Sequence, residues 1–205
     1  MGQVIADITM TLDGFIAGPD DGVEKRLGEG GERIHQWLYD SPTWRELHGQ
    51  TGGEERADSA LVAEAFERSG TVVMGRRMFE NGNGPNGWGD EPPFHKPVFV
   101  LTHEAREPSV KEGTTFTFVT DGIEGALEQA RAAAGDKDVQ VGGGANAIQQ
   151  FIKAGLLDEL QVHVAHVLLG GGIPLFGELG SEQIELESTR VMDAPGVTHL
   201  RFSFA

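Results

Sequence analysis

The chain has 205 residues, 39% of them hydrophobic, with 16 basic and 32 acidic residues, a net charge of −16 and no cysteine. This length is sufficient for one domain with a substantial core. The acidic balance excludes sequence-independent binding to nucleic acids or anionic membranes, and the lack of cysteine excludes disulfides, thiolate metal sites and a cysteine nucleophile.

No apolar run approaches the roughly 20 residues of a membrane span, and the N-terminus lacks a signal-peptide pattern. We therefore expect a soluble, cytoplasmic protein. Because no repeat or long linker interrupts the sequence, we expect one domain over residues 1–205, with a variable, lid-like region at about residues 18–55.

The first half of the chain is predicted to mix strands with short helices. The expected strands cover residues 3–10, 71–74 and 97–102, and the expected helices cover residues 32–39, 42–48, 56–69 and a short segment from residue 75. Ser41 is predicted to cap the second helix, with Pro42 at its first position. Trp37 and Trp44 are expected either to pack inward or to line a substrate pocket beneath a lid.

The second half is predicted to end in β structure. Strands are expected at residues 115–120, 139–141 and 160–169, helices at residues 123–134 and from residue 145, and a closing hairpin at residues 183–191 and 197–204. Strand and helix alternate through the middle of the chain before this hairpin. The order favours an α/β fold with a mostly parallel sheet covered by helices and antiparallel strands at the C-terminal end.

The most informative stretch is residues 139–152, where a short strand leads into Gly142, Gly143 and Gly144 and a helix begins at Ala145. Glycine lets the backbone approach a ligand, and a helix N-terminus supplies N–H groups and partial positive charge. The pattern favours a nucleotide diphosphate; the alternative is a tight turn without a ligand. It does not indicate a Rossmann domain, because no acidic residue ends the next strand.

Two further strand ends carry candidate ligand groups. Gly75 ends a strand, and Arg76 and Arg77 open the next helix, where guanidinium groups can hold phosphate. The alternative is a surface pair that bridges to nearby acids. Thr102 and His103 end the following strand and could contact an adenosine ribose or its 2′-phosphate. In an open α/β sheet such strand ends meet in one crevice.

The histidines do not show metal-ligand spacing. His163 and His166 lie three residues apart on a strand and should point to opposite faces. The other histidines considered are scattered, namely His35, His48, His95 and His199. No metal site is therefore expected, and neither a nucleophile elbow nor a P-loop lysine motif is present.

Five motifs together resemble the dihydrofolate reductase-like family: residues 11–17 (TLDGFIA), 73–80 (VMGRRMFE), 141–144 (VGGG), 156–160 (LLDEL) and 167–176 (VLLGGGIPLF). The resemblance spans nearly the whole chain and is to the riboflavin-biosynthesis reductase (RibD C-terminal) domain and its stand-alone relatives. It implies a three-layer α/β/α fold, NADPH as cofactor and often a homodimer. The chain shows no zinc deaminase domain.

The resemblance also implies roles for individual residues. Cofactor contacts would come from Ile16 and Ala17 near the nicotinamide, Gly75, Arg76 and Arg77 at the phosphates, Thr102 and His103 near the adenosine ribose, and Gly142, Gly143, Gly144, Ala145 and Asn146 at the diphosphate. Asp13, the only acid of the first motif, is predicted to bind or protonate the substrate. Trp37, Trp44 and Trp88 are candidates for the substrate side.

We therefore expect hydride transfer from NADPH to a C=N or C=O bond of a small heterocyclic or sugar-like substrate. The reaction would resemble that of a 5-amino-6-(5-phosphoribosylamino)uracil reductase or a dihydrofolate reductase. One alternative is a non-catalytic NADP(H)-binding sensor or structural dimer, because a fold can be retained without its activity. Another is an acidic scaffold that binds no ligand.

Overall fold

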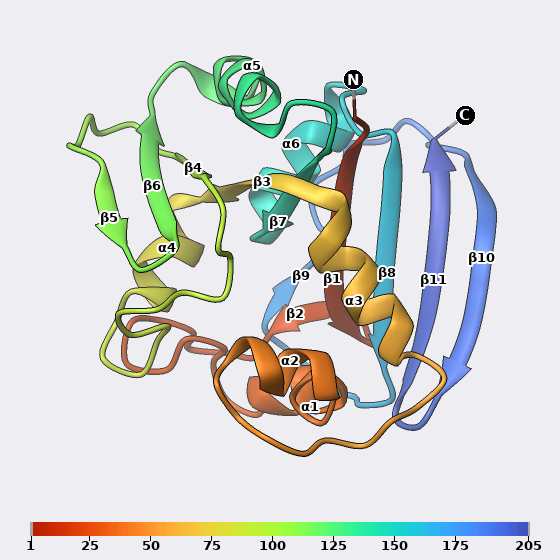
Figure 1. Cartoon of the computed structure of the whole chain (residues 1–205). Helices are drawn as coiled ribbons and strands as arrows, with labels where there is room; N and C mark the ends of the chain where they lie inside the picture. The colour runs from red at the N-terminus through yellow and green to blue at the C-terminus, as the bar shows by residue number, and fades with distance from the viewer. Residues whose placement is uncertain (1, 205) are drawn as a thin grey trace.

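The computed structural model describes residues 2–204, which form a large sheet, a small accessory sheet and the helices around them (Figure 1). The strands are β1 (Val4–Thr11), β2 (Phe15–Ala17), β3 (Ser69–Gly75), β4 (Val98–Leu101), β5 (Ser109–Lys111), β6 (Thr114–Val119), β7 (Asp138–Gly143), β8 (Glu159–Ala165), β9 (Ile173–Pro174), β10 (Leu186–Ala194) and β11 (Val197–Phe204). The helices are the 3-10 helix η1 (Gly31–His35), α1 (Gln36–Tyr39), α2 (Pro42–Leu47), α3 (Ser59–Arg68), α4 (Arg76–Gly82), α5 (Gly122–Ala134) and α6 (Ala145–Lys153).

The large sheet has the strand order β10-β11-β8-β1-β7-β3-β4-β6-β5, and β2 pairs with β9 in the small one. The central pairs, from β8 through β1, β7, β3 and β4 to β6, are parallel. The β10–β11, β11–β8 and β5–β6 pairs are antiparallel, and β10 and β5 form opposite edges (Figure 1). This topology confirms the predicted α/β fold with a mostly parallel sheet and antiparallel C-terminal strands.

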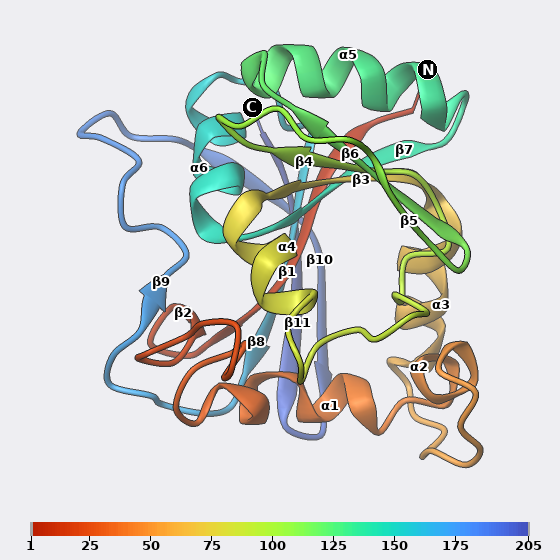
Figure 2. The ribbon, with the colours of Figure 1, turned by 90° about the vertical axis from the view of Figure 1, so that its left-hand side faces the viewer.

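Side-chain alternation gives the sheet two different faces. On one face, Val4 and Ala6 of β1 pack with Ile148 and Phe151 of α6 in the largest apolar cluster, to which α5 also contributes. Burial of a large apolar side chain of this kind is worth about 1.5–3 kcal/mol. Figure 2 shows α5 lying along β3, β4 and β7, while α1 and α2 lie at the far end of the molecule.

The opposite face of the sheet is more polar. Asp7 of β1 and His163 of β8 alternate with the apolar residues of their strands and lie on this face. Trp37 of α1 and Val62 of α3 form a smaller apolar cluster that covers part of it. The polar side chains are therefore held beneath short helices instead of facing solvent freely.

Several elements differ from the sequence prediction at their ends. The strand expected over residues 160–169 stops at Ala165, because Val167 donates a hydrogen bond back to Ala165 and accepts one from Leu12. The helix expected from residue 56 begins at Ser59. Ser41 does precede α2, but its side chain makes no capping hydrogen bond.

Other differences concern short elements. The helix expected over residues 32–39 is divided into η1 and α1. The strands β2, β5 and β9 were not predicted, since each has at most three residues and shows no readable alternation. Within residues 2–204, no helix is long and apolar enough to cross a membrane.

Candidate functional site

The large sheet divides beyond the middle of β1. This strand pairs with β7 only from Val4 to Ala6, the latter opposite Val141, yet it stays paired with β8 as far as Thr11. In contrast, β7 follows β3 up to Gly143. The two parts of the sheet therefore separate toward the carboxyl ends of their parallel strands, which is where open α/β sheets bind ligands.

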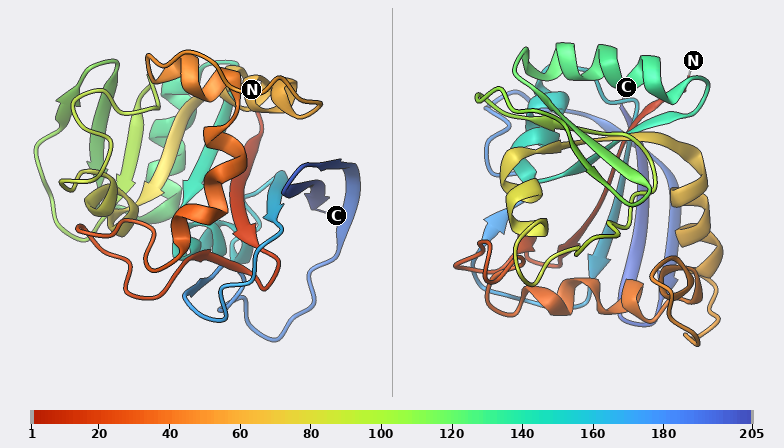
Figure 3. Two further views of the ribbon diagram at one scale, coloured as in Figure 1. Left: turned by 90° about the horizontal axis from the view of Figure 1, so that it is seen from below. Right: turned by 60° about the vertical axis from the view of Figure 1, so that its left-hand side comes forward.

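A cavity of about 780 Å³ lies at this division, lined by residues of β1 and β8 on one part and of β7, β3 and β4 on the other. Its size is typical of sites for small molecules and cofactors, which measure about 300–1,000 Å³. Further lining comes from the region predicted to be lid-like, including Arg26, Trp37 and Tyr39. Seen from below in Figure 3, α1 and α2 of this region lie in front of the strands.

Residues 142–146 line the cavity with the glycine turn and the start of α6. The peptide bond between Gly143 and Gly144 is cis. A Cβ added at Gly144 would meet no atom within 4 Å, and one added at Gly75 would lie 3.8 Å from the Gly144 nitrogen, so β3 ends beside an open turn.

This turn can hold an anion. The first hydrogen bonds of α6 run from the N–H groups of Ala147 and Ile148 to the carbonyl of Gly144. The N–H groups that precede them have no intrahelical acceptor, as at any helix start. Free N–H groups, a helix N-terminus and the absence of a blocking side chain fit the diphosphate of a nucleotide cofactor.

Arg76 and Arg77 also line the cavity, but each guanidinium already contacts an acid. Arg76 Nη1 lies 3.1 Å from Glu80 Oε1, and Arg77 makes a two-pronged ion pair with Asp21. The two arginine side chains remain 49% and 65% exposed, so a phosphate can still reach them. Such a phosphate would compete with two carboxylates for the guanidinium groups.

The remaining residues predicted to contact the cofactor line the same cavity. Thr102 is buried directly after β4, and its hydroxyl oxygen accepts a hydrogen bond of 3.1 Å from the Glu104 N–H. His103 follows it with an exposed side chain. Ile16 and Ala17 contribute the wall formed by β2. The structure thus brings all of the predicted cofactor residues to one site.

The three tryptophans predicted for the substrate side line this cavity too. Trp37 is only 5% exposed, and the centroid of its ring lies 4.7 Å from that of His163 and 5.0 Å from that of His199. Trp44 lies in α2, and Trp88 lies in the loop after α4. Trp37 therefore packs inward and lines the cavity at the same time, so the two expectations for it are compatible.

Asp13 does not line the cavity. Its carboxylate accepts hydrogen bonds from the backbone N–H groups of Leu169 (3.1 Å) and Gly170 (2.7 Å) and so joins the turn after β1 to the loop after β8. The Thr11 hydroxyl and these N–H groups lower the pKa of Asp13. The geometry makes Asp13 a backbone anchor outside the cavity. Its role in binding or protonating the substrate stays a prediction.

A chain of hydrogen bonds that was not predicted reaches the cavity wall. His163 Nε2 lies 2.8 Å from Asp7 Oδ1, and His163 Nδ1 lies 2.6 Å from His199 Nδ1. His199 Nε2 lies 3.3 Å from Asp58 Oδ2. Asp7 and His163 line the cavity. No group of three or more His, Asp or Glu residues within residues 2–204 is suited to hold a metal ion.

Sequence spacing could not reveal this series of hydrogen bonds, because the residues that form it come from β1, β8, β11 and the segment before α3. Alternation along β8 does place His163 opposite the apolar face. However, only the register of the strands, which pairs His163 with Thr9 and with His199, brings the histidines together.

Comparison with known proteins assigns the chain to a family. Residues 3–199 match the family model of the RibD C-terminal domain. Two uncharacterised Bacillus subtilis proteins are each 26% identical to the chain: YwjB over 192 residues, covering 92% of this chain and 91% of its own, and YyaP over 185 residues, covering 85% and 80%.

Solved structures agree with this assignment. A protein from Shewanella sp. PV-4 that is assigned by name to riboflavin biosynthesis has a TM-score of 0.67 and 25% identity, with 99% of each chain covered. A pyrimidine reductase-like protein from Corynebacterium diphtheriae shares the fold at a TM-score of 0.59 and 12% identity, over 100% of this chain and 92% of its own. The diaminohydroxyphosphoribosylaminopyrimidine deaminase/5-amino-6-(5-phosphoribosylamino)uracil reductase of Thermotoga maritima also shares the fold, with a TM-score of 0.62 and 14% identity. The match covers 100% of this chain but only 57% of that longer protein. The chain belongs to the RibD C-terminal domain family.

Proposed function

We propose that the protein is an NADPH-dependent reductase that transfers hydride to a C=N or C=O bond of a small heterocyclic or sugar-like substrate. The observation that carries the proposal is that a glycine turn at a helix start, two arginines and an aromatic wall all line one cavity at the carboxyl ends of the strands. Membership of the RibD C-terminal domain family, over residues 3–199, supports a reductase of the type found in riboflavin biosynthesis.

In this proposal the glycine turn and the first N–H groups of α6 hold the cofactor diphosphate. Arg76 and Arg77 add positive charge at its phosphates, and Thr102 and His103 lie near the adenosine ribose. NADPH, when bound, supplies the hydride. Ile16 and Ala17 provide an apolar surface against which the nicotinamide can be oriented.

The substrate end of the cavity is formed largely by aromatic rings. Trp37, Trp44 and Trp88 offer flat apolar surfaces, which favour a planar ring and exclude water. Asp7 and His163 supply polar groups there. Held against such a surface, a substrate loses orientational freedom, and this is the main contribution of the protein to hydride transfer.

Cofactor binding is tested by titrating the protein with NADPH and, separately, with NADH, following nicotinamide fluorescence and the midpoint of thermal unfolding. We expect tighter binding of NADPH and a rise in the unfolding midpoint. Turnover is tested with aldehydes, cyclic imines and dihydropterins as acceptors, by the loss of NADPH absorbance. If neither nucleotide binds, the proposal is wrong.

The sequence also allowed a non-catalytic NADP(H)-binding sensor or structural dimer. The same assays distinguish this alternative from the reductase. It predicts tight NADPH binding with no turnover of any acceptor.

Association into a homodimer remains part of both proposals. It is supported by the edge strand β10, where Leu186 and Val191 are 39% and 65% exposed, since an unpaired edge with apolar side chains favours pairing with another chain. Light scattering measures the mass of the species in solution.

A further inference from the structure

Reduction of a C=N or C=O bond requires a proton as well as a hydride. Asp7 and His163 are polar groups of the cavity wall at the point where the sheet divides. The side chain of Asp7 is 14% exposed and that of His163 is 4% exposed, so Asp7 is the more accessible member of the pair. Gln161 Nε2 donates a hydrogen bond of 3.0 Å to the second oxygen of Asp7, which fixes the carboxylate.

The hydrogen-bonded chain behind Asp7 needs more protons than neutral imidazoles can supply. Its contacts join Asp7 to His163, His163 to His199 and His199 to Asp58, and each requires one proton between its heavy atoms. Two neutral imidazoles provide only two N–H protons, and ionised carboxylates provide none. The chain is therefore satisfied when it carries one additional proton.

With both carboxylates ionised and acting as acceptors, the directions of these hydrogen bonds assign the additional proton to His163. Burial, together with the neighbouring His163, lowers the pKa of His199 to about 4, so His199 is neutral at neutral pH. The Nε2–H group of His199 then donates to Asp58, and its Nδ1 accepts from His163. His163 donates in both directions, to His199 and to Asp7, and is an imidazolium.

The surroundings of the chain favour this arrangement. Asp58 is paired with Arg56 at 3.3 Å, and both side chains are buried, so the remote carboxylate is already compensated. Trp37 covers both imidazole rings, and its carbonyl accepts a hydrogen bond of 2.7 Å from Arg56. The titratable or charged groups that face His163 or its partners are Asp7, His199, Asp58, Arg56, His35, which burial holds neutral with a pKa of about 4, and Arg201, which contacts Gln161.

We propose that His163 is the proton donor of the reduction and that the proton reaches the substrate by way of Asp7. Bound NADPH would supply hydride to the carbon of the C=N or C=O bond and would leave as NADP⁺. The electron pair released from the double bond would take up a proton at nitrogen or oxygen. The Nε2–H bond of His163 breaks, and its electron pair stays on the ring. The proton binds to Asp7 Oδ1 and is then transferred from this oxygen to the substrate nitrogen or oxygen. His163 is left neutral, Asp7 stays ionised, and solvent returns the proton before the next turnover.

Asp7 is in this scheme the catalytic residue that touches the substrate, while His199 and Asp58 are positioning residues that keep His163 protonated and oriented. The scheme rests on the proposed reductase function. Its first prediction, however, concerns the protein without substrate.

The protonation state is measured in protein labelled with ¹⁵N at histidine. Long-range ¹H–¹⁵N spectra are assigned by comparison with His163→Gln and His199→Gln variants. At neutral pH we expect protons on both ring nitrogens of His163 and only on Nε2 of His199. A His163 ring with one unprotonated nitrogen would overturn the proposal.

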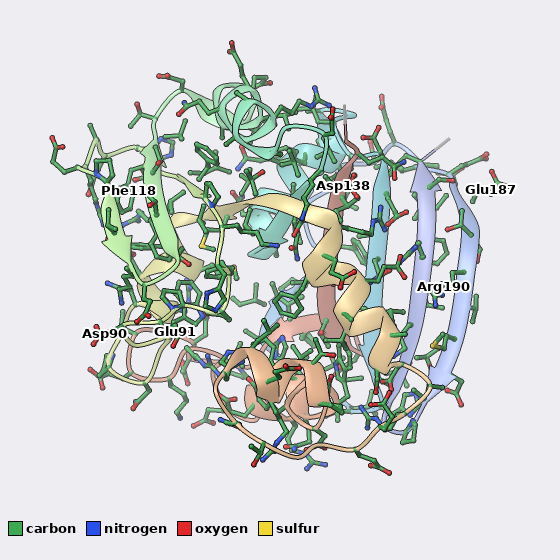
Figure 4. All side chains as sticks on the ribbon, viewed as in Figure 1. Asp90, Glu91, Phe118, Asp138, Glu187 and Arg190 are labelled. Carbon is green, nitrogen blue, oxygen red and sulfur yellow. The ribbon has the colours of Figure 1, made fainter. Side chains whose placement is uncertain are left out.

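The catalytic step is measured with saturating NADPH and an acceptor from the panel above that is turned over. We expect Asp7→Asn to lower kcat by at least about 100-fold, in the range of lost general acid catalysis, with NADPH affinity unchanged. Asp138→Asn is the matched control. Asp138 is 16% exposed and paired with Arg68 at 2.9 Å, but as the first residue of β7 it lies at the end of the strand away from α1 and α2 (Figure 4).

The positioning role of His199 is tested by its pH dependence. His199→Gln keeps an acceptor for His163 and a donor for Asp58, whereas His199→Phe keeps neither. We expect the pH at which the rate declines to fall in the Phe variant and to be restored in the Gln variant. Normal turnover by Asp7→Asn, with NADPH bound, would overturn this proposal alone, whereas NADPH binding without turnover of any acceptor would overturn the reductase function as well.

Discussion

Ala6 and Val141 are the last paired residues of β1 and β7, and the two strands diverge immediately after them. The next residue on one strand is Asp7, and the next on the other is Gly142, and both line the cavity. A single divergence therefore places an acid on one wall of the cavity and the glycine turn, to which we assign the cofactor phosphates, on the other. The distance between these walls is set by the strands, which are rigid elements, and not by loops.

Gly144→Ala should separate cofactor binding from stability. The added Cβ has no atom within 4 Å, so the fold should tolerate it, with the unfolding free energy changed by less than about 0.5 kcal/mol. The methyl group would project into the space assigned to the diphosphate, and we expect the Kd for NADPH to rise at least about tenfold, or about 1.4 kcal/mol.

Calorimetric titration and urea unfolding measure the two quantities. Gly171→Ala is the control, because its Cβ would meet only Pro19 at an ordinary 3.8 Å and Gly171 does not line the cavity. Unchanged NADPH affinity in Gly144→Ala would show that the diphosphate does not bind at this turn.

Asp21→Asn should strengthen NADPH binding. The substitution removes the carboxylate that pairs with Arg77 and leaves the guanidinium available to a phosphate. We expect the Kd to fall several-fold at low salt and less at high salt, because the gain is electrostatic and is screened.

The Arg76→Ala, Arg77→Ala double variant should lose the preference for NADPH over NADH. A double variant that still prefers NADPH would place the 2′-phosphate elsewhere.

Asp13→Asn should affect stability and not activity. The carboxylate anchors the backbone N–H groups of Leu169 and Gly170, and an amide is a weaker acceptor for them. We expect a lower midpoint of thermal unfolding with unchanged NADPH affinity and unchanged turnover. A large loss of kcat without a change in this midpoint would restore the catalytic role that the sequence suggested.

The protein should lose stability in mildly acidic solution. Burial lowers the pKa of His35 and of His199 from 6.5 to about 4. Between these values the unfolded chain binds protons that the folded chain does not, so the unfolding free energy falls as the pH decreases through this window. Each histidine contributes at most about 3 kcal/mol.

Urea unfolding at pH 7 and pH 5 measures this loss. His35→Gln should make it smaller, because Gln has no proton to gain. His166→Gln, at an exposed position, should leave it unchanged. Equal losses in the wild type and in His35→Gln would contradict the assignment of His35.

The sequence by itself determined which residues form the glycine-rich and arginine-bearing wall of the cavity, where we propose that the cofactor binds. The glycines at residues 142–144, the arginines after Gly75 and the pair at residues 102–103 each follow a short apolar run, and in a parallel sheet such positions must meet at one edge. Local patterns were sufficient because every one of these groups lies next to the strand that positions it. The same reasoning gave the mostly parallel sheet and the C-terminal hairpin.

Only the tertiary structure showed which side chains form the opposite wall of the cavity, on β1 and β8. Asp13 stands in a recognisable motif, yet the loop after β8 folds against it and uses its carboxylate as a backbone acceptor. Asp7, His163 and His199 lie in no motif, and they meet because the register of β1, β8 and β11 aligns them on one face. Hydrogen bonding between side chains of distant strands depends on strand order and register, which local sequence periodicity does not contain.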